Sequence, residues 1–173
     1  PALVPLKVQS SAGKLHVRDD LLAYYPATLG FMPAAAPLTC RGPQSLALGN
    51  IDGDAERRLD LAVGCRDDGE VRILRNRGGG ALQAGAALPA GARPAAVALT
   101  DLDGDGRPEL LVASAGDNAL LLRRPDGSGG FADATPYLVG LQPVALAAVD
   151  LDGNGLRDVA VLHQVSRDVL VLP

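Results

Sequence analysis

Three short acidic loops carry the residue types whose spacing could bind a metal ion. The second loop reads DLDGDGRPE over residues 101–109, and the third reads DLDGNGLRD over residues 150–158. In both loops carboxylate or amide oxygens occupy positions 1, 3, 5 and 9, and a glycine at position 6 permits a left-handed turn. These oxygens can converge on one point, to which position 7 can add a backbone carbonyl oxygen.

Calcium is the ion that this ligand set suits best. Ca²⁺ accepts several hard oxygen ligands in irregular geometry, whereas Mg²⁺ requires stricter octahedral geometry and Zn²⁺ prefers His or Cys. Eleven of the 20 acidic residues lie in the three loops, four, four and three in chain order. Without a cation, two carboxylates about 4 Å apart would repel by roughly 1–4 kcal/mol. An EF-hand would need a Glu at position 12, where Val112 and Val161 stand, so that motif is excluded.

The acidic loops belong to a repeat that predicts the architecture. Their first residues are Asn50, Asp101 and Asp150, which gives spacings of 51 and 49 residues. Each copy contains an apolar stretch, the acidic loop, a second apolar stretch, a turn and a third stretch, and a less regular fourth segment precedes the next copy. Four short strands in about 50 residues is the period of a β-propeller blade.

Composition supports strands over helices. The chain of 173 residues contains 21 Gly and 13 Pro, which interrupt the apolar stretches too often for long helices. Ala and Leu are good helix formers, but pieces of five to seven residues between turns are too short for two capped helical turns. The stretch 156–172 lacks Gly and Pro, and its repeat counterparts are broken by glycines, so we expect two strands there.

The repeats divide the chain into four segments of an all-β protein. We expect a partial N-terminal blade over 1–42, a blade with a degenerate calcium loop over 43–91, a blade with a calcium loop over 92–140, and a C-terminal blade over 141–173 that lacks its fourth strand. About three and a half four-stranded blades form a partial or open arc with unpaired edges. Those edges would be completed by further chain, a second copy or another subunit; a four-bladed closure is the alternative.

The chain resembles the FG-GAP/VCBS repeats, which are the calcium-loop blades of integrin α-subunit propellers and many bacterial surface proteins. The resemblance is carried by the second and third loops, their flanking strands, and the Gly-Phe pairs at residues 30–31 and 130–131. It implies a β-propeller in which each calcium loop joins the first and second strands of a blade. The implied ligands are Asp101, Asp103, Asp105, Glu109 and the carbonyl of Arg107 in the second loop, and Asp150, Asp152, Asn154, Asp158 and the carbonyl of Leu156 in the third.

The first loop, over residues 50–60, departs from this pattern. Asn50 stands at position 1, Ala55 replaces the glycine, and the closing carboxylate of Asp60 comes two residues late, with Arg58 where a ligand belongs. Ala55 would be strained in a left-handed conformation. We expect the metal site of this first loop to be weak, distorted or empty. Its ligands would be Asp52, Asp54 and Asp60, with Asn50 as a fourth.

No residue pattern indicates catalysis. His16 and His163 lie in different repeats on strand-like segments and are expected to be ordinary strand residues. The spacing suggests neither a Ser-His-Asp nor a Cys-His arrangement, and the chain has no phosphate-binding glycine loop. Arginines gather near the third strands of two adjacent blades, where a solvated rim is favoured over an anionic partner surface; they are Arg72, Arg75, Arg77, Arg123 and Arg124.

We therefore expect a non-catalytic calcium-binding repeat protein that acts in protein–protein interaction, adhesion or assembly scaffolding. The net charge of −4 excludes a basic nucleic-acid footprint, and no apolar stretch is long enough for a transmembrane helix. A carbohydrate-binding propeller is one alternative, although 3% aromatic residues and no Trp disfavour it. An accessory domain of a larger secreted enzyme is the other.

The calcium concentration that such loops need indicates the compartment in which the protein is located. Extracellular calcium modules commonly need millimolar calcium, which favours a secreted, periplasmic or cell-surface location. Cys40 and Cys65 are either bridged or two buried thiols, and an oxidising compartment makes the bridge more plausible.

Overall fold

The computed structural model describes residues 8–9, 15–16, 40–79 and 81–173. The chain divides into two compact units, residues 1–36 and 37–173. In the first unit, β1 (Val8–Gln9) pairs antiparallel with β2 (Leu15–His16), with Val8 opposite His16. Most of the partial blade predicted over 1–42 lies outside the described residues, so that blade stays a prediction.

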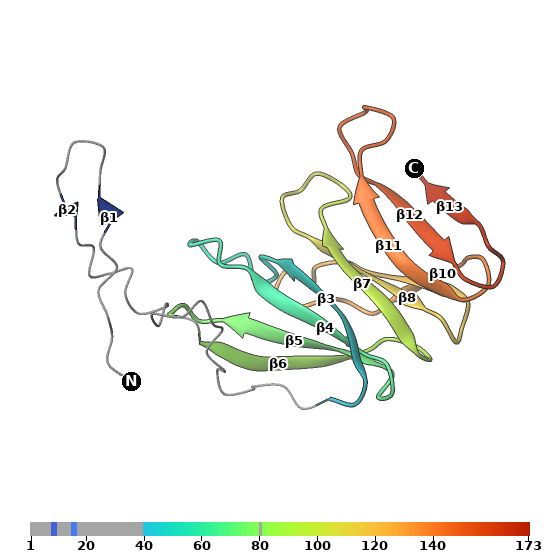
Figure 1. Cartoon of the computed structure of the whole chain (residues 1–173), viewed down its shortest axis with the longest axis horizontal. Coiled ribbons are helices and arrows are strands. Elements are labelled where there is room, and N and C mark those ends of the chain that lie inside the picture. The colour runs from blue at the N-terminus through green and yellow to red at the C-terminus, as the bar shows by residue number, and fades with distance from the viewer. Residues whose placement is uncertain (1–7, 10–14, 17–39, 80) are drawn as a thin grey trace. The chain divides into compact units, whose positions relative to one another are not determined.

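The second unit is all-β and consists of three antiparallel sheets of four, four and three strands (Figure 1). The first sheet contains β3 (Pro43–Gly49), β4 (Asp60–Cys65), β5 (Glu70–Asn76) and β6 (Leu82–Pro89). The second contains β7 (Pro94–Thr100), β8 (Glu109–Ser114), β9 (Ala119–Arg123) and β10 (Thr135–Leu138). The third contains β11 (Pro143–Val149), β12 (Asp158–His163) and β13 (Val169–Leu172).

Strand order follows chain order in every sheet, as expected for blades that repeat one meander. Each acidic loop joins the first and second strands of its sheet. The segment 156–172 forms β12 and β13, so the punctuation of the repeat outweighs its helical composition. The three sheets are consistent with partial propeller blades, and the described residues do not close into a ring.

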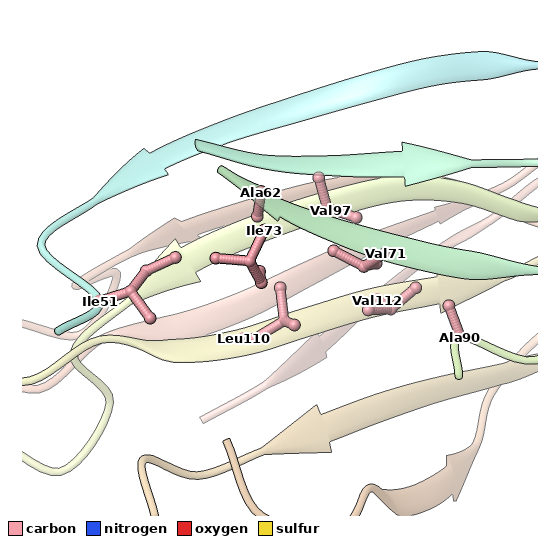
Figure 2. Close-up of a cluster of buried hydrophobic side chains, with 8 residues drawn as sticks. All are labelled: Ile51, Ala62, Val71, Ile73, Ala90, Val97, Leu110 and Val112. Atoms are coloured by element: carbon pink, nitrogen blue, oxygen red, sulfur yellow. The ribbon is translucent and has the colours of Figure 1, made fainter. Parts of the chain in front are cut away.

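Packing between successive sheets explains why the middle sheet is apolar on both faces. Its first strand, β7, lies between β3 and β11 (Figure 1). Leu110 and Val112 of β8 point toward the first sheet, where they pack in the cluster that Figure 2 shows. Leu111 packs instead with Val159 and Val161 of the third sheet. Side chains alternate faces along a strand, so a central strand covered on both sides must be apolar at successive positions.

Phe131, one of the two aromatic residues of the Gly-Phe pairs, packs against the cluster between the first and second sheets. The outer sheets behave differently from the middle one. Leu46 and Leu48 of β3 are 63% and 51% exposed, and Val169 and Val171 of β13 are 58% and 46% exposed. Apolar side chains of the repeat therefore remain uncovered on the first and third sheets.

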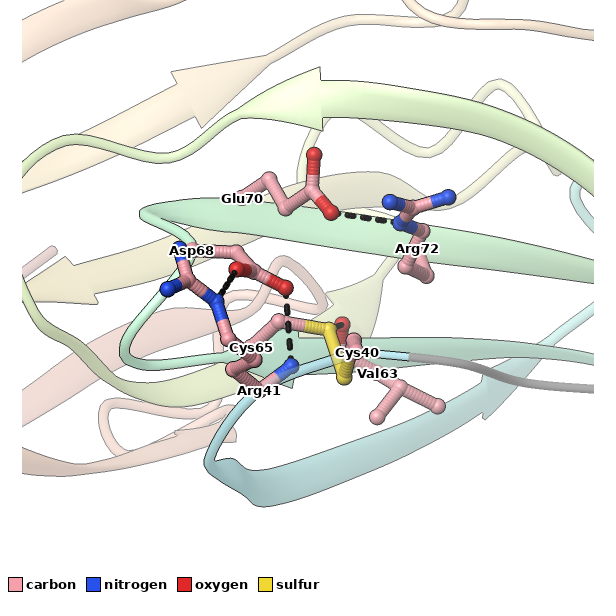
Figure 3. The surroundings of a disulfide bond; sticks show 7 residues. All are labelled: Cys40, Arg41, Val63, Cys65, Asp68, Glu70 and Arg72. Carbon is pink, nitrogen blue, oxygen red and sulfur yellow. Dashed lines mark hydrogen bonds and ion pairs between the residues drawn. A yellow bond between two sulfur atoms is a disulfide. The ribbon is translucent and has the colours of Figure 1, made fainter.

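A disulfide joins Cys40 to Cys65, with their Cα atoms 5.8 Å apart (Figure 3). Of the two alternatives that the sequence leaves open, the bridge is the one observed. It ties the segment before β3 to the end of β4 across 25 residues, which corresponds to about 3–4 kcal/mol in the chain-entropy model. None of the described residues forms a helix long and apolar enough to cross a membrane.

The turns between second and third strands hold the preceding connection through aspartate side chains. Asp68 accepts the Arg41 N–H at 2.8 Å, as Figure 3 shows, and Asp117 accepts the Ala92 N–H at 2.7 Å. The hydrogen bond from the Ala92 N–H, with a second from the Ser114 hydroxyl, lowers the pKa of Asp117. These turns fix one end of the first and second sheets, and the acidic loops lie at the other end of the second strands.

Candidate metal centres

The second acidic loop brings three carboxylates together between β7 and β8. Asp101, Asp103 and Glu109 each offer an oxygen atom, and these atoms lie within 4.8 Å of one another. The Gly104 and Gly106 N–H groups donate to the two oxygens of Asp101 at 2.8 and 2.9 Å. Gly106, the glycine at position 6, has φ of 85°, so the left-handed turn that the sequence predicts is present.

Glu109 is the buried member of this group, only 1% exposed at the start of β8. Its Oε2 accepts the Leu102 N–H at 2.8 Å, whereas its buried Oε1 has no hydrogen-bond partner. Burial raises the pKa of Glu109, the Leu102 hydrogen bond opposes that shift, and the charges of Asp103 and Asp105 add to it. A buried carboxylate oxygen without a partner is costly, so the residues present fit a bound cation.

The third loop repeats this arrangement between β11 and β12. Asp150, Asp152 and Asp158 form the second group of converging carboxylates. Asp158, 3% exposed, accepts the Leu151 N–H at 2.7 Å, just as Glu109 accepts the Leu102 N–H. The Gly155 N–H donates to Asp150 at 2.9 Å and is the main cause that lowers the pKa of that carboxyl.

Two predicted ligands face their own loop backbone. Asp105 Oδ1 accepts the Arg107 N–H, and Asn154 Oδ1 accepts the Leu156 N–H, each at 2.7 Å. Asp105 does not lie in the group of converging carboxylates. The side chains at position 5 and the carbonyls of Arg107 and Leu156 therefore stay predicted ligands.

The first loop has a different structure. Asp60, 1% exposed at the start of β4, accepts hydrogen bonds from the Ile51 N–H at 3.1 Å and the Asn76 N–H at 2.8 Å. Among the residues that the structure describes, the carboxylates of this loop form no group like the other two.

Two details of the first loop differ from expectation. Arg57, not Ala55, has positive φ, at 51°, because the two additional residues before Asp60 shift the turn along the chain. Arg58 does not reach the buried carboxylate. Its guanidinium pairs with Asp54 at 3.0 Å and Glu56 at 3.1 Å, on the rim of the loop.

Asp52, Asp54 and Asn50 complete the first loop. Asn50 Oδ1 accepts the Asp54 N–H at 3.2 Å, and Asp54 Oδ1 accepts the Arg58 N–H at 2.9 Å. Asp52 Oδ2 lies 4.0 Å from Arg75 and 3.8 Å from Arg77. The acidic side chains of this loop therefore have arginine neighbours.

The arginines near the third strands make contacts that the sequence analysis did not predict. Arg75 donates to Asp60 at 3.1 Å, and Arg124 donates to Asp103 at 3.1 Å. Arg123, 5% exposed, donates to the carbonyls of Ala132 and Pro89. A solvated rim therefore describes Arg124 but not Arg75 or Arg123.

Strand register is the signal that could have revealed the Arg75 contact. Leu61 of β4 lies opposite Leu74 of β5, so the antiparallel pairing brings Asp60, the residue before Leu61, next to Arg75, the residue after Leu74.

His163 is buried in β12, and both of its ring nitrogens contact neighbouring groups of the protein. Its Nε2 accepts the Gly140 N–H at 3.0 Å, and its Nδ1 lies 2.7 Å from Asp168 Oδ1. These bonds hold the connection between the second and third sheets against the end of β12.

Comparison with known proteins agrees with the repeat geometry. No curated protein matches the chain. The model of the FG-GAP-like repeat matches twice, over residues 52–112 and 101–161, and each match extends from one acidic loop through the next. Because the matched residues make up more than half of the sequence, the chain belongs to the family of FG-GAP-like repeat proteins.

Proposed function

We propose that this protein is a non-catalytic calcium-binding repeat protein whose second and third loops each hold one ion. The observation that carries the proposal is the buried Glu109 carboxylate, which has one oxygen without a partner and two further carboxylates beside it. In the third loop the buried Asp158 likewise has two further carboxylates beside it, which supports a shared role for the two sites.

Calcium suits these groups because their donors are hard oxygens from one short loop. Asp101, Asp103 and Glu109 would hold the ion in the second loop, and Asp150, Asp152 and Asp158 would hold it in the third. A bound Ca²⁺ would offset two of the three carboxylate charges at each site and link each loop to the strand that follows it. The role of the ions would then be to stabilise the folded repeats. The carboxylates would not act as catalytic acids or bases, because they would be engaged as metal ligands.

Calcium titration of the metal-free protein by calorimetry tests the proposal. We expect two sites per chain, and melting in EDTA at a clearly lower temperature than in calcium. Each site adds about 2.7 kcal/mol at a hundredfold excess of calcium over Kd. An unchanged melting curve in EDTA together with no binding heat would refute the proposal. Magnesium at the same concentration controls for nonspecific charge screening.

The proposed role of the folded repeats is protein–protein interaction or assembly. The exposed apolar residues of β3 and β13 support it, because Leu46, Leu48, Val169 and Val171 come from the repeat positions at which sheets pack on one another. β13 also has no strand on its second side among the described residues, and such an edge can accept another strand.

Self-association can be tested with this protein alone, because it needs no other partner. We expect concentration-dependent association by sedimentation velocity, and loss of it when Val169 and Val171 are both replaced by Lys. A monodisperse monomer at every concentration would refute it. As a control, Val165→Lys places the same charge at an exposed position in the turn before β13.

A carbohydrate-binding role has weaker support. The cavity of about 380 Å³ between the second and third sheets is lined mainly by leucines, with Tyr137 as its aromatic residue. Sugar sites usually place polar groups around a stacking ring, so this lining does not favour a glycan. A glycan array without binding would exclude this alternative.

We also propose an extracytoplasmic location. The Cys40–Cys65 disulfide supports it, because such bridges persist in oxidising compartments, and calcium sites of this kind are filled at the millimolar concentrations outside cells. Intact mass after alkylation of the protein, isolated from its native source without reductant, should show no labelled thiol. Two labelled thiols would contradict the proposal.

A further inference from the structure

Asp60 of the first loop is the structural counterpart of Glu109 and Asp158. All three begin the second strand of their sheets. Each accepts the backbone N–H of the second loop residue, which is Ile51, Leu102 or Leu151. The first loop therefore keeps the buried carboxylate of the other two, although its length and sequence differ.

The difference lies in what neutralises that carboxylate. In the second loop Glu109 Oε1 is buried without a partner. In the first loop, Asp60 Oδ1 accepts the Asn76 N–H, and Asp60 Oδ2 accepts the Arg75 guanidinium at 3.1 Å. Both oxygens of Asp60 are thus satisfied by the protein itself.

Arg75 lies where it can balance several charges. Its Nη1 is 4.0 Å from Asp52 Oδ2 as well as 3.1 Å from Asp60, and its side chain is 15% exposed. Arg58 and Arg77 pair with the remaining carboxylates of the loop. Four acidic side chains, Asp52, Asp54, Glu56 and Asp60, therefore face three guanidinium groups.

The second loop has far less internal compensation. Its four acidic side chains have one arginine partner in the described structure, which is Arg124 on the exposed Asp103. A divalent cation is consequently attracted to the second loop, whereas the first loop offers it little uncompensated negative charge.

Arg75 also connects two sheets. Its second guanidinium nitrogen donates to the carbonyl of Gly129, in the connection that precedes Phe131 of the second sheet. Gly129 has φ of 87°, and a Cβ added there would lie 3.3 Å from Asp52 Cβ, so this connection packs closely on the first loop.

We propose that the guanidinium of Arg75 takes the place of the metal ion in the first loop, so that this repeat is fixed to its neighbour without calcium. The inference rests on the proposed function for the metal content of the other loops. The inference adds that one protein combines two calcium-dependent repeats with one repeat that is held by an internal ion pair.

Matched variants in equivalent positions test this inference. Asp60→Asn and Glu109→Gln make the same chemical change at the start of β4 and β8. Calorimetry should find two calcium sites in the parent protein, two in Asp60→Asn and one in Glu109→Gln. Three sites in the parent protein, or one site in Asp60→Asn, would overturn the inference.

Arg75→Met, which keeps the aliphatic stem and removes the charge, tests the ion pair directly. Leaving Asp60 buried without its ion pair should lower Tm by about 6–20 °C, equally in calcium and in EDTA. An unchanged Tm in EDTA would overturn the inference. If Arg75→Met does not fold, Arg75→Lys retains a charge with a shorter reach and should show a smaller loss.

The two proposals can fail separately. A parent protein that binds no calcium refutes the proposed function, while the melting of Arg75→Met in EDTA still decides the role of Arg75. A parent protein with three sites supports calcium binding and refutes the inference.

Discussion

Replacing Glu109 by Gln should change stability in opposite directions with and without calcium. The substitution keeps the size of the side chain and an oxygen for the Leu102 N–H. It replaces the partnerless Oε1 with an amide that can donate to the neighbouring carboxylates of Asp101 and Asp103. The perturbation therefore removes one buried charge and leaves the packing of β8 intact.

In EDTA, the Gln variant should be the more stable protein. The raised pKa of Glu109, caused mainly by burial, means that its ionised form is less favourable in the folded than in the unfolded state. The metal-free fold therefore loses stability as pH rises from about 4.5, the ordinary value of the carboxyl, through the raised pKa of the folded protein. Relief of a buried unsatisfied group is about 1–3 kcal/mol, or about 2–12 °C in Tm for a chain of this size.

In calcium, the order should reverse. The parent protein gains about 2.7 kcal/mol per site at a hundredfold excess of calcium over Kd, and the variant loses the contribution of one site, which outweighs any relief below about 2.7 kcal/mol. Melting curves of both proteins at pH 7, in EDTA and in saturating calcium, measure the reversal. Glu56→Gln is the control, because it makes the same charge change at a side chain that is 63% exposed.

Equal destabilisation of Glu109→Gln in both conditions would refute the reasoning. Glu109 would then act only as a hydrogen-bond acceptor for the loop backbone. Lower stability of the variant in EDTA alone would refute it as well, since the partnerless oxygen would not be the costly group.

Three further predictions concern the scaffold. Asp117, whose pKa is lowered by the hydrogen bonds it accepts, should contribute stability above its ordinary pKa of 3.8 that is lost as pH falls through the lower folded value, and Asp117→Asn should flatten this acid limb of the melting profile. Reducing the Cys40–Cys65 bridge should cost about 3–4 kcal/mol in denaturant unfolding, and a double Ser variant should be insensitive to reductant. Leu110→Ala should cost about 2–5 kcal/mol because Leu110 is fully buried between two sheets, whereas Leu59→Ala, half exposed, should cost far less.

The local sequence pattern predicted those strands and loops whose structure depends on residues close to each other in the chain. Glycine punctuation and the 50-residue repeat predicted three consecutive meanders, and the spacing of oxygen donors predicted the loops that converge. Helix propensity was the competing signal over 156–172, and it was overridden because β12 pairs with both β11 and β13.

The contacts that local sequence pattern does not predict come from pairing across strands and sheets. Arg75 is 15 residues from Asp60, and it meets that carboxylate only because the register of β4 and β5 aligns them. Its second contact, to Gly129, spans 54 residues and depends on how two sheets pack. Arg58 is closer in sequence, yet the two additional loop residues direct it to Asp54 and Glu56.

Across the three loops, the constant element is the hydrogen bond from a backbone N–H to the carboxylate that starts the second strand, and the variable element is the source of positive charge. The hydrogen bond needs only an acidic residue at that position, so Asp and Glu both serve, and the two additional residues of the first loop are tolerated. In the first loop a guanidinium from the third strand meets the charge of the buried carboxylate, and in the second and third loops a cation is proposed to do so. If calcium fills the second and third loops as proposed, Arg75 supplies in the first loop the positive charge that the ions supply in the other two, while the buried carboxylate keeps its place at the start of the second strand.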